Sequence, residues 1–351
     1  MIVEKVTSIQ VAERAGVSQS AVSRVFTPGA SVSKKTAEKV RKAAKELGYR
    51  PNILARAMVS GRSRIIGLVV AYLENYFYPE VVEKLSNSLQ ERGYHVLIFM
   101  ASQTTGNIDD VMEEILDYQV DGIILASVAL SSDIATRCQQ AGVPAVLFNR
   151  SQSGEGVTSV TSDNHAGGRK AARLLVAGGH HRLGYIAGWE GASTQRDREA
   201  GFRAGLAEAG QSLFAREVGD FNADRARDAA RRMFEHAPAQ RPDAVFVAND
   251  HMAFAVMDVL RFELGLSVPH DVSVIGYDDV PPAAWLAYGL TTIRQRANLM
   301  VAETVAALIE MIESQDPPMP RNIQIDGPLI LRKSTRIPEG WTPERIGHEG
   351  L

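Results

Sequence analysis

Residues 7–26 constrain the fold of this chain more than any other segment, because their spacing is that of a helix-turn-helix. Thr7 can cap a first helix, and Gly16 follows where a helix ends on a left-handed residue. Ser18 can then cap a second helix. We expect the inner face of the first helix to carry Ile9, Val11, Ala12 and Ala15.

The second helix of this segment would share a small core with the first. Ala12 is small enough for the two helices to cross closely. The apolar residues that would close the shared core are Val17, Val22 and Val25. The polar face left outside comprises Gln19, Ser20, Ser23 and Arg24. Because any amphipathic helix can show this spacing, the surrounding sequence has to decide whether the segment reads DNA.

A third short helix is predicted after a loop. Ser33 can cap it, Gly48 can end it, and its apolar positions are Ala37, Val40, Ala44 and Leu47. Three helices in about 50 residues build only a small core. We therefore predict an all-helical head over residues 1–50.

Charge is divided unequally between the two ends of the chain. Residues 1–64 hold 13 lysines and arginines against four glutamates, a net charge of +9. The remaining residues hold 25 basic and 37 acidic side chains, a net charge of −12. A basic head on an acidic body is typical of a protein that brings one end to a polyanion. The phosphate backbone of DNA is the partner that this pattern favours.

Length and composition predict a protein of two or three domains. With 351 residues, 45% of them hydrophobic, and a mean hydropathy of −0.10, the chain is typical of soluble globular proteins. No apolar run approaches the ~20 residues of a membrane span, and residues 1–5 lack the order of a signal peptide, so we expect a cytoplasmic protein. Cys138 is the single cysteine, which excludes an internal disulfide and argues against cysteine-based zinc sites. We expect it to act as a small apolar residue on a helix, and we expect no cofactor.

From residue 65 onward, apolar runs alternate with amphipathic stretches such as 81–92 and 169–177, as in parallel α/β sheets. The apolar runs span residues 65–71, 95–101, 122–126, 145–148, 183–187, 244–248 and 272–277. About 230 residues of this pattern are too many for one small sheet. We predict an α/β body of two doubly wound lobes, whose facing strand ends form a ligand cleft. Between head and body, residues 51–61 favour a helix too short to be stable without a partner.

A series of motifs follows the chain in a fixed order. They are Ala-Gly-Val-Ser at 15–18, Ala-Val-Ser-Arg-Val at 21–25, Glu-Leu-Gly-Tyr-Arg-Pro-Asn at 46–52, Gly-Arg-Ser-Arg-Ile-Ile-Gly-Leu at 61–68, Asp-Gly-Ile-Ile-Leu at 121–125, Ser-Asp-Asn-His-Ala-Gly-Gly at 162–168, Arg-Glu-Ala-Gly-Phe at 198–202, Ala-Asn-Asp at 248–250, Ser-Val-Ile-Gly-Tyr-Asp-Asp at 273–279 and Leu-Thr-Thr-Ile-Arg-Gln at 290–295. In this order they resemble the LacI/GalR family of bacterial transcription regulators, over residues 6–338.

The resemblance implies a homodimer, or a tetramer built from dimers, in which two heads bind a pseudo-palindromic operator DNA. The body would bind a small effector, with a sugar, polyol or sugar acid favoured. It also implies a hinge helix over 51–61 and a body over 62–340. The N-lobe would take about 62–162 and 292–324, and the C-lobe about 163–291 and 325–340, with crossings near 162, 291 and 325. The tail, 341–351, has no heptad pattern, so no tetramerising coiled coil is expected.

The resemblance assigns the reading of bases to Gln19, Ser20 and Arg24. Gln can pair with adenine N6 and N7, and Arg with guanine O6 and N7. The positions better placed for phosphate contacts or for helix capping are Thr7, Ser18, Ser33, Thr36, Tyr49 and Asn52. Ser23 lies on the same exposed face as the base readers.

In the family's hinge helix, an apolar side chain enters the minor groove between base pairs. The matching residue is Met58, where most relatives carry Leu, and packing within the hinge dimer is the alternative role. Ala55 is small enough for two hinge helices to approach closely, and Arg56 can reach phosphate. Three further positions depart from the family pattern: Gln10 replaces an Asp, and Gly289 and Arg296 replace prolines near a lobe crossing.

Eight positions match effector contacts in the cleft: Phe77, Tyr78, Ser127, Asn149, Arg198, Phe221, Asn249 and Asp278. Arg198, Asn249 and Asp278 offer donors and acceptors suited to vicinal hydroxyls, and Arg198 also suits a carboxylate. The ring of Phe221 can cover a sugar face. Capping of a loop is the alternative role for Asp163 and Asp278.

Two other classes of protein can be weighed against a regulator. His180, His181 and Glu190 could suggest a metalloenzyme, but adjacent histidines point apart, and no His-x-x-x-His, Walker or Gly-x-Ser-x-Gly pattern occurs, so no enzyme is predicted. A transport-type sugar-binding protein would carry an export signal and no basic head. Release of DNA by the effector is the expected response, and a corepressor is the alternative. Residues 81–89 would form a dimer face or, alternatively, a core helix.

Overall fold

The computed structural model describes residues 6–27, 30–50, 62–71, 73–101, 108–127, 137–138, 140–152, 156–314, 316 and 318–341. The chain divides into two compact units, Met1–Arg64 and Ile65–Leu351, which we call the head and the body. The expected hinge residues Asn52, Ala55, Arg56 and Met58 lie outside the described residues.

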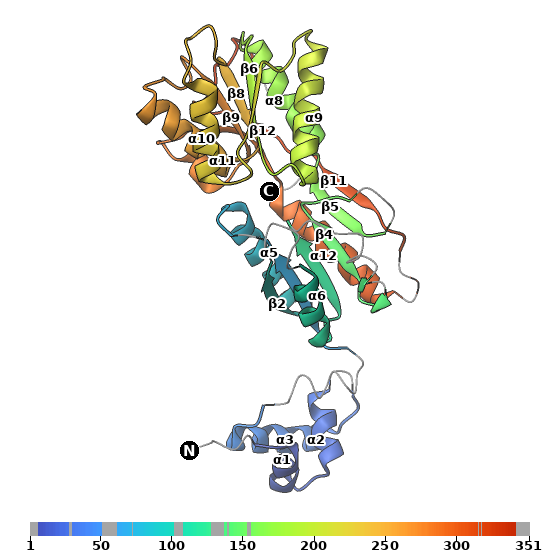
Figure 1. Ribbon diagram of the computed structural model, residues 1–351. Helices are drawn as coiled ribbons and strands as arrows, with labels where there is room; N and C mark the ends of the chain where they lie inside the picture. The colour runs from blue at the N-terminus through green and yellow to red at the C-terminus, as the bar shows by residue number, and fades with distance from the viewer. Residues whose placement is uncertain are drawn as a thin grey trace. The chain divides into compact units, whose positions relative to one another are not determined.

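The head contains the three predicted helices, α1 (Ser8–Ala15), α2 (Gln19–Phe26) and α3 (Lys34–Leu47) (Figure 1). The Thr7 hydroxyl accepts a hydrogen bond from the Gln10 backbone N–H, and the Gln10 side chain accepts one from the Thr7 N–H at 2.8 Å. This capping box gives the departure at Gln10 a structural role. Gly16 has φ 65°, as expected for the turn.

The core of the head is small and comprises Val11, Ala12, Val22, Val40, Ala43 and Ala44. The inner-face prediction was wrong for Ile9, which is 53% exposed. With 3.6 residues per turn, Ile9 lies about a third of a turn from the stripe formed by Val11, Ala12 and Ala15. The first helix therefore buries a narrower face than the sequence pattern suggested.

The first lobe of the body is built on a fully parallel sheet (Figure 1). Its strands, in spatial order, are β11 (Asn322–Ile325), β5 (Thr158–Ser162), β4 (Ala145–Phe148), β3 (Gly122–Ala126), β1 (Ile65–Val70) and β2 (His95–Met100). Alternate residues of β1 enter two cores: Ile66 and Leu68 pack with α5 (Phe77–Glu91) and α12 (Ala297–Glu313), and Val69 packs with α6 (Ile108–Asp117). Both faces of the sheet are thus covered, as a parallel sheet requires.

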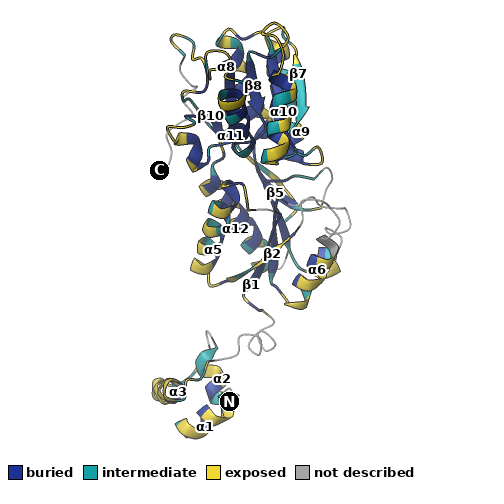
Figure 2. Cartoon of the chain, turned by 60° about the vertical axis from the view of Figure 1, so that its left-hand side comes forward, coloured by how far each residue is buried: buried dark blue, intermediate teal, exposed yellow. Residues whose placement is uncertain are grey.

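The second lobe has a sheet of the same kind, with one antiparallel edge strand. Its strands, in spatial order, are β12 (Leu329–Ile330), β10 (Thr291–Arg294), β9 (Ser273–Asp278), β8 (Ala244–Val247), β6 (Leu183–Ala187) and β7 (Ala215–Val218). Only β12 runs antiparallel to its neighbour. The helices are α8 (Asn164–Ala177), α9 (Ser193–Glu208), α10 (Ala223–Phe234) and α11 (Asp250–Asp258), with a π-helical turn at Val259–Glu263 and a 3-10 turn at Pro281–Ala284. Figure 2 shows inner strands such as β1 and β8 as buried, whereas the edge strands β2, β7 and β11 are half-buried or exposed.

The chain passes between the two sheets three times. It leaves the first sheet after Ser162 and returns after Arg294, and it leaves again after Ile325. The second crossing comes later than the expected position near 291, because residues 291–294 still pair with β9. Each lobe therefore contains segments that are distant in the sequence.

Helix α5 contains residues 81–89, for which the sequence predicted either a dimer face or a core helix. Val81, Leu85 and Leu89 are fully buried within the single body, where they pack against the first sheet. The core alternative is therefore right for these three residues, and a dimer face on the rest of the helix stays a prediction.

The two helices that border the second lobe, α8 and α9, approach each other so closely that glycine is required at the contact. A Cβ atom on Gly168 would overlap the backbone of α9 at Arg198, and one on Gly201 would overlap the backbone of α8 at His165. This contact holds Arg198 of α9 beside Asn164 of α8, with Arg198 Nε donating to Asn164 Oδ1 at 2.8 Å.

We expect Gly201→Ala to destabilise the protein by about 1–3 kcal/mol, since the added methyl group forces the helices apart. Helix propensity alone predicts that the alanine raises the free energy of unfolding by roughly 0.5–1 kcal/mol. The sign of the measured change therefore shows whether the helix contact or the propensity dominates. Urea unfolding of the full chain measures it, with the exposed Ala207→Ser change on the same helix as the control. A more stable Gly201→Ala protein would show that the close helix contact is not required.

Candidate functional site

The exposed face of α2 carries the four polar residues that the sequence singled out. Gln19, Ser20, Ser23 and Arg24 are all exposed, whereas Val22 beneath them is fully buried. Gln19 Nε2 donates to Ser8 Oγ at 3.0 Å, and Arg24 Nε donates to the Ser20 carbonyl at 3.4 Å. The helix thus presents a polar surface whose other side is anchored in the core of the head.

Three hydroxyl residues proposed for phosphate contact or capping act as helix caps. The side chains of Thr7, Ser18 and Ser33 accept hydrogen bonds from backbone N–H groups at the starts of α1, α2 and α3. Thr36 Oγ1 is hydrogen-bonded to Ser33 Oγ at 2.9 Å, and the Tyr49 ring packs against Phe26. The capping alternative is therefore confirmed for the three caps, and phosphate contact by these five residues stays a prediction.

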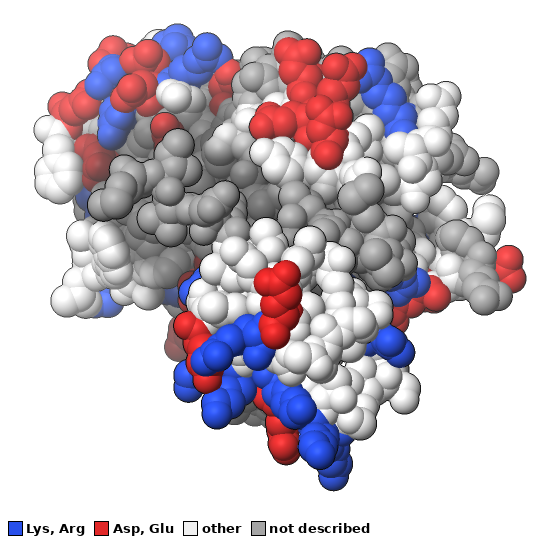
Figure 3. Space-filling view, turned by 90° about the horizontal axis from the view of Figure 1, so that it is seen from below, with Lys and Arg blue, Asp and Glu red and all other residues white. Residues whose placement is uncertain are grey.

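Basic side chains gather on the surface of the head. Helix α3 alone carries six exposed cations: Lys34, Lys35, Lys39, Arg41, Lys42 and Lys45. Figure 3 shows Lys and Arg side chains concentrated on one side of this unit. A basic surface of this kind attracts a polyanion.

The body contains a cavity between its two lobes. It is lined by Asn75, Tyr78, Asn149, Arg150, Thr194, Arg198, Phe221, Asn249 and Asp278. Six of the eight predicted effector contacts are among these residues: Tyr78, Asn149, Arg198, Phe221, Asn249 and Asp278. The structure therefore brings most of the predicted set together, although what they bind stays a prediction.

The other two predicted contacts do not line the cavity. The ring of Phe77 lies in the core, with its centroid 6.3 Å from that of Phe148 and 5.4 Å from that of Tyr78. Ser127 lies behind Arg150 and accepts a hydrogen bond from Arg150 Nη2 at 2.8 Å. Three lining residues were missed, Asn75, Arg150 and Thr194; the only signal for Arg150 was its place directly after Asn149 at a strand end.

The cavity lies where the carboxyl ends of strands from both sheets face each other, as in other open α/β folds. Asn149 follows β4, Phe221 follows β7 and Asn249 follows β8, while Asp278 ends β9. Asn149, Phe221, Asp278 and the adjacent Ser127 all have positive φ, between 55° and 126°. Such conformations are uncommon outside glycine and cluster at binding sites.

Arg198 and Asp278 form a buried ion pair in the wall of the cavity. Arg198 is only 2% exposed, and its Nη2 lies 3.7 Å from Asp278 Oδ1. Its other nitrogens donate to Asn164 and to the Ala248 carbonyl, and its guanidinium lies over the Tyr277 ring, 3.7 Å from the centroid. Burial raises the pKa of the Asp278 carboxyl, and the Arg198 guanidinium opposes that rise.

Direct hydrogen bonds join the lobes around the cavity. Asn75 Nδ2 of the first lobe donates to Asp278 Oδ2 of the second at 3.0 Å. Arg150 Nη1 donates to Thr194 Oγ1 at 2.9 Å, and the Ser151 N–H donates to Ser193 Oγ at 2.9 Å. A ligand that competes for these groups would therefore act on the angle between the lobes.

The candidate metal residues lie apart from this cavity. His180 is fully buried and His181 is exposed, so the adjacent pair points in opposite directions as expected. Burial lowers the pKa of His180 to about 4, against the effect of Asp243, whose Oδ1 lies 3.5 Å from His180 Nδ1. In the described ranges, no group of three or more His, Cys, Asp or Glu side chains is arranged to hold a metal ion.

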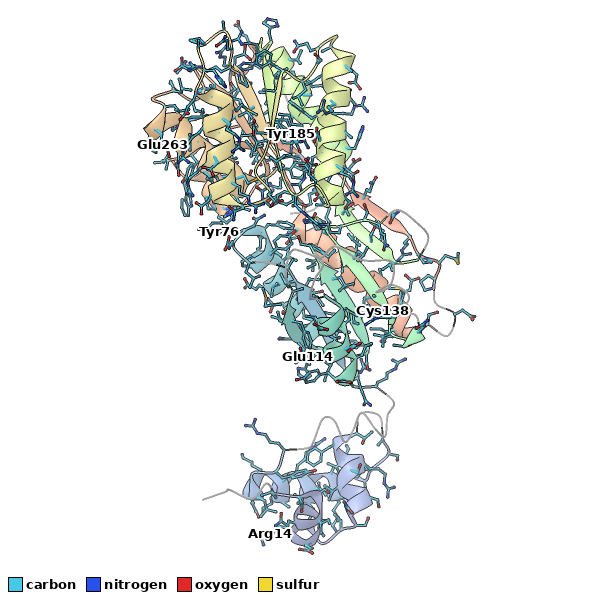
Figure 4. All side chains as sticks on the ribbon, in the orientation of Figure 1. Arg14, Tyr76, Glu114, Cys138, Tyr185 and Glu263 are labelled. Atoms are coloured by element: carbon cyan, nitrogen blue, oxygen red, sulfur yellow. The ribbon has the colours of Figure 1, made fainter. Side chains whose placement is uncertain are left out.

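Cys138 is buried, and two of the family departures lie away from the cavity. Burial raises the pKa of the Cys138 thiol to about 11, so the side chain is an inert apolar group in the first lobe (Figure 4). Gly289 has φ 51°, which a proline cannot adopt. Arg296 precedes α12, and neither it nor Gly289 lines the cavity.

Among the helices described, none has the length and apolar character needed to cross a membrane.

Comparison with known families matches both parts of the chain. Residues 9–52 match the family described as bacterial regulatory proteins, lacI family. Residues 172–335 match the family described as periplasmic binding protein-like domain. The first match covers the helix-turn-helix and α3, and the second contains most of the second lobe.

Known proteins resemble the chain over nearly its whole length. The HTH-type transcriptional regulator CelR of Thermobifida fusca is 34% identical over 337 residues, which cover 92% of this chain and 96% of CelR. The crystal structure of the lac repressor dimer bound to operator and the anti-inducer ONPF has a TM-score of 0.84 and 30% identity, over 95% of this chain and 99% of that one. A structure of a CelR–cellobiose complex has a TM-score of 0.71 and 31% identity, over 94% and 100% of the two chains.

Proposed function

The chain belongs to the lacI family of bacterial regulatory proteins, and on that basis we propose that it is a transcriptional repressor, released from operator DNA when a small sugar-like effector binds the body. The observation that carries this proposal is the presence in one chain of two separate binding features. One is the exposed polar face of α2 on a basic head, and the other is the cavity between two lobes. The protein would act in the cytoplasm, where its DNA lies, and without catalysing a reaction.

In the head, Gln19, Ser20 and Arg24 would read base edges in the major groove. Their side chains are exposed, adjacent on the helix, and of the types that recognise adenine and guanine. Ser23 and the residues at the helix starts, together with the lysines of α3, would contact phosphates and orient the head without specifying sequence.

In the body, the six predicted residues that line the cavity would bind the effector. Hydrogen bonds between the lobes pass along the cavity wall, so an effector that replaces them changes the free-energy balance between two lobe angles. Since the coupling is reciprocal, effector and operator would each weaken the other's binding by the same factor.

A homodimer accounts for apolar side chains that a single body leaves exposed. In β2, an edge strand of the first sheet, Ile98 and Met100 are each 50% exposed, and in the second lobe Leu286 is 96% exposed beside the half-exposed Trp285. An unpaired edge strand with apolar side chains is a surface that proteins normally cover. We infer that a second copy covers both lobes here, as two heads are needed for a pseudo-palindromic operator.

The test uses the full chain and an operator selected from a randomised double-stranded DNA library. A thermal-shift screen of sugars, polyols, sugar acids and nucleobases identifies ligands of the body. Each ligand is then added to an operator-binding titration at fixed salt, where we expect affinity to fall by about 5- to 150-fold. A ligand that tightens operator binding would make the protein corepressor-dependent, and ligands that bind without changing DNA affinity would contradict the proposal.

A further inference from the structure

We propose that Asp250 is a positioning residue whose carboxyl group holds a proton at neutral pH and, in that neutral form, fixes one wall of the cavity from behind. Asp250 is the first residue of α11 and directly follows the cavity residue Asn249. Its own side chain does not line the cavity. Because Asp250 contacts no ligand, its role can be tested without an effector and independently of the proposed repressor function.

The Asp250 carboxyl joins three elements of the second lobe. Its Oδ2 accepts a hydrogen bond at 3.0 Å from the backbone N–H of Val280, which follows β9. Its Oδ1 lies 2.6 Å from Oγ1 of Thr292 in β10. A Cβ atom on Gly276 of β9 would overlap Oδ1, so the backbone of that strand lies directly against the carboxyl. The start of α11 is therefore tied to the segment that carries Asp278.

The two acidic residues at the end of β9 have arginine partners, and Asp250 has none. These partners are Arg198 and Arg150 for Asp278, and Arg294 and Arg332 for Asp279. Asp250 is fully buried, and no Lys, Arg or His side chain of the described residues forms an ion pair with it. An ionised carboxylate in such a place, near two other carboxylates, is strongly unfavourable, whereas a neutral carboxylic acid is not.

The electrostatics of the two buried acids place the proton on Asp250. Burial, followed by the charge of Asp278, raises the pKa of the Asp250 carboxyl to about 8, while hydrogen bonds from Thr292 and Val280 oppose the rise. Burial also raises the pKa of Asp278, but the Arg198 guanidinium opposes that rise. The Thr292 hydroxyl can accept a hydrogen bond from a carboxylic acid as readily as it can donate one to a carboxylate.

This proton makes the wall of the cavity sensitive to pH. The pKa of Asp250 in the folded protein lies above the ordinary value of 3.8, so the folded chain binds more protons than the unfolded chain between about pH 4 and pH 8. The stability contributed by Asp250 is therefore complete below that range and is lost as the pH rises through it. Above it, an ionised Asp250 would repel Asp278 and loosen the loop at Val280.

Infrared spectroscopy of the full chain in D₂O detects the proton directly. Ordinary Asp and Glu side chains are ionised at pH 7, so a protonated-carboxyl band there identifies an exceptional group. We expect the band in the wild type at pH 7, its loss by about pH 10, and its absence in Asp250→Asn, whose amide keeps the shape and hydrogen bonding of a neutral acid. The control, Asp224→Asn, removes a carboxylate on a side chain that is 89% exposed and should keep the band.

Urea unfolding at several pH values and one protein concentration measures the same proton through stability. All three tryptophans lie in the body, so their fluorescence follows its unfolding. We expect the ratio of the unfolding constants, wild type over Asp250→Asn, to rise about tenfold per pH unit between about pH 5 and pH 7. Burial lowers the pKa of His180 and of His251, which act in the opposite sense, so only the ratio is diagnostic. The ratio for Asp224→Asn should stay constant.

Hydrogen exchange connects the proton to the cavity wall. After correction for the intrinsic effect of pH, exchange in peptides that contain Val280 should accelerate about tenfold or more between about pH 7 and pH 9.5 in the wild type. In Asp250→Asn, whose amide oxygen accepts from the Val280 N–H at every pH, it should not. Equal acceleration in the two proteins would mean that the proton does not fix the wall.

The other outcomes decide where the proton lies. A wild-type spectrum without the band at pH 7, a band that survives Asp250→Asn, or a ratio of unfolding constants that does not change with pH would overturn the proposal. If Asp250→Asn fails to fold, Thr292→Val takes its place: loss of the hydroxyl should shift the band of a proton held by Asp250, and an unshifted band would place the proton elsewhere. These measurements include neither DNA nor effector, so a negative result leaves the repressor proposal standing.

Discussion

Arg24→Ala should weaken binding of the full-length dimer to its operator by about 30-fold to 10⁴-fold. A bidentate contact between an arginine and guanine is worth about 1–3 kcal/mol, and a dimer makes two of them. The combined loss of about 2–6 kcal/mol corresponds to this range at 1.4 kcal/mol per tenfold change. The large effect follows from the position of Arg24 on the exposed face of α2, directly above a buried helix face.

The measurement is fluorescence anisotropy at fixed salt, with the selected operator and with DNA of unrelated sequence. Arg14→Ala is the matched control: Arg14 lies on α1 of the same head (Figure 4), pairs with Glu46 at 2.9 Å and carries the same charge. Both variants should lose a similar, small amount of affinity for unrelated DNA, and only Arg24→Ala should lose selectivity. If Arg24→Ala binds the operator as tightly and selectively as the wild type, α2 does not read the bases through this residue.

Asp278→Ala should destabilise the body by about 3–5 kcal/mol and also abolish the response of DNA binding to the effector. The carboxylate balances the buried Arg198 and accepts hydrogen bonds from Gln295 Nε2 at 2.7 Å and from Asn75 across the lobes. Removing one partner of a buried pair leaves the other charge unpaired in a low-dielectric site, which accounts for the size of the effect. Urea unfolding measures the stability, and operator titration with effector measures the coupling.

Asp224→Ala is the contrasting control, because the Asp224 carboxylate pairs with Arg227 on the surface and its side chain is 89% exposed. Exposed pairs of this kind contribute roughly 0–1 kcal/mol. The double variant Arg198→Met/Asp278→Leu should recover part of the stability that Asp278→Ala loses, since no buried charge then remains unpaired. If Asp278→Ala lowers the free energy of unfolding by less than about 1 kcal/mol, the ion pair between Arg198 and Asp278 is hydrated and does not stabilise the body.

The helix caps and helix ends of the head were predicted correctly because each depends on residues close together in the sequence. Thr7, Ser18 and Ser33 cap helices through N–H groups within three residues, and Gly16 ends α1 by its own backbone conformation. Ile9 shows where this reasoning stops. Its apolar character indicated burial, but the width of the buried face depends on which other helix packs against α1.

In the body, strands were predicted where apolar residues run together, and strands without such runs were missed. β5 has the sequence Thr-Ser-Val-Thr-Ser and is buried along its whole length, since its hydroxyls find partners such as Asn322 and Gln295, which are distant in the sequence. The same limit explains the shifted second crossing. The pairing of β10 with β9 is a contact between segments, and no local pattern in residues 291–294 records it.

The sequence by itself determined the helix-turn-helix, the unequal charge, the α/β class and, through its motifs, the family and six of the cavity residues. Only the tertiary structure decided which polar side chains are paired. Arg198 and Arg150 have the same chemistry and both line the cavity, yet Arg198 lies 3.7 Å from Asp278 Oδ1, whereas Arg150 donates hydrogen bonds to the Asn149 carbonyl, Thr194 and Ser127. The reason is physical: the pairing of a buried charge depends on distances between residues far apart in the chain, and these exist only after the two sheets have assembled.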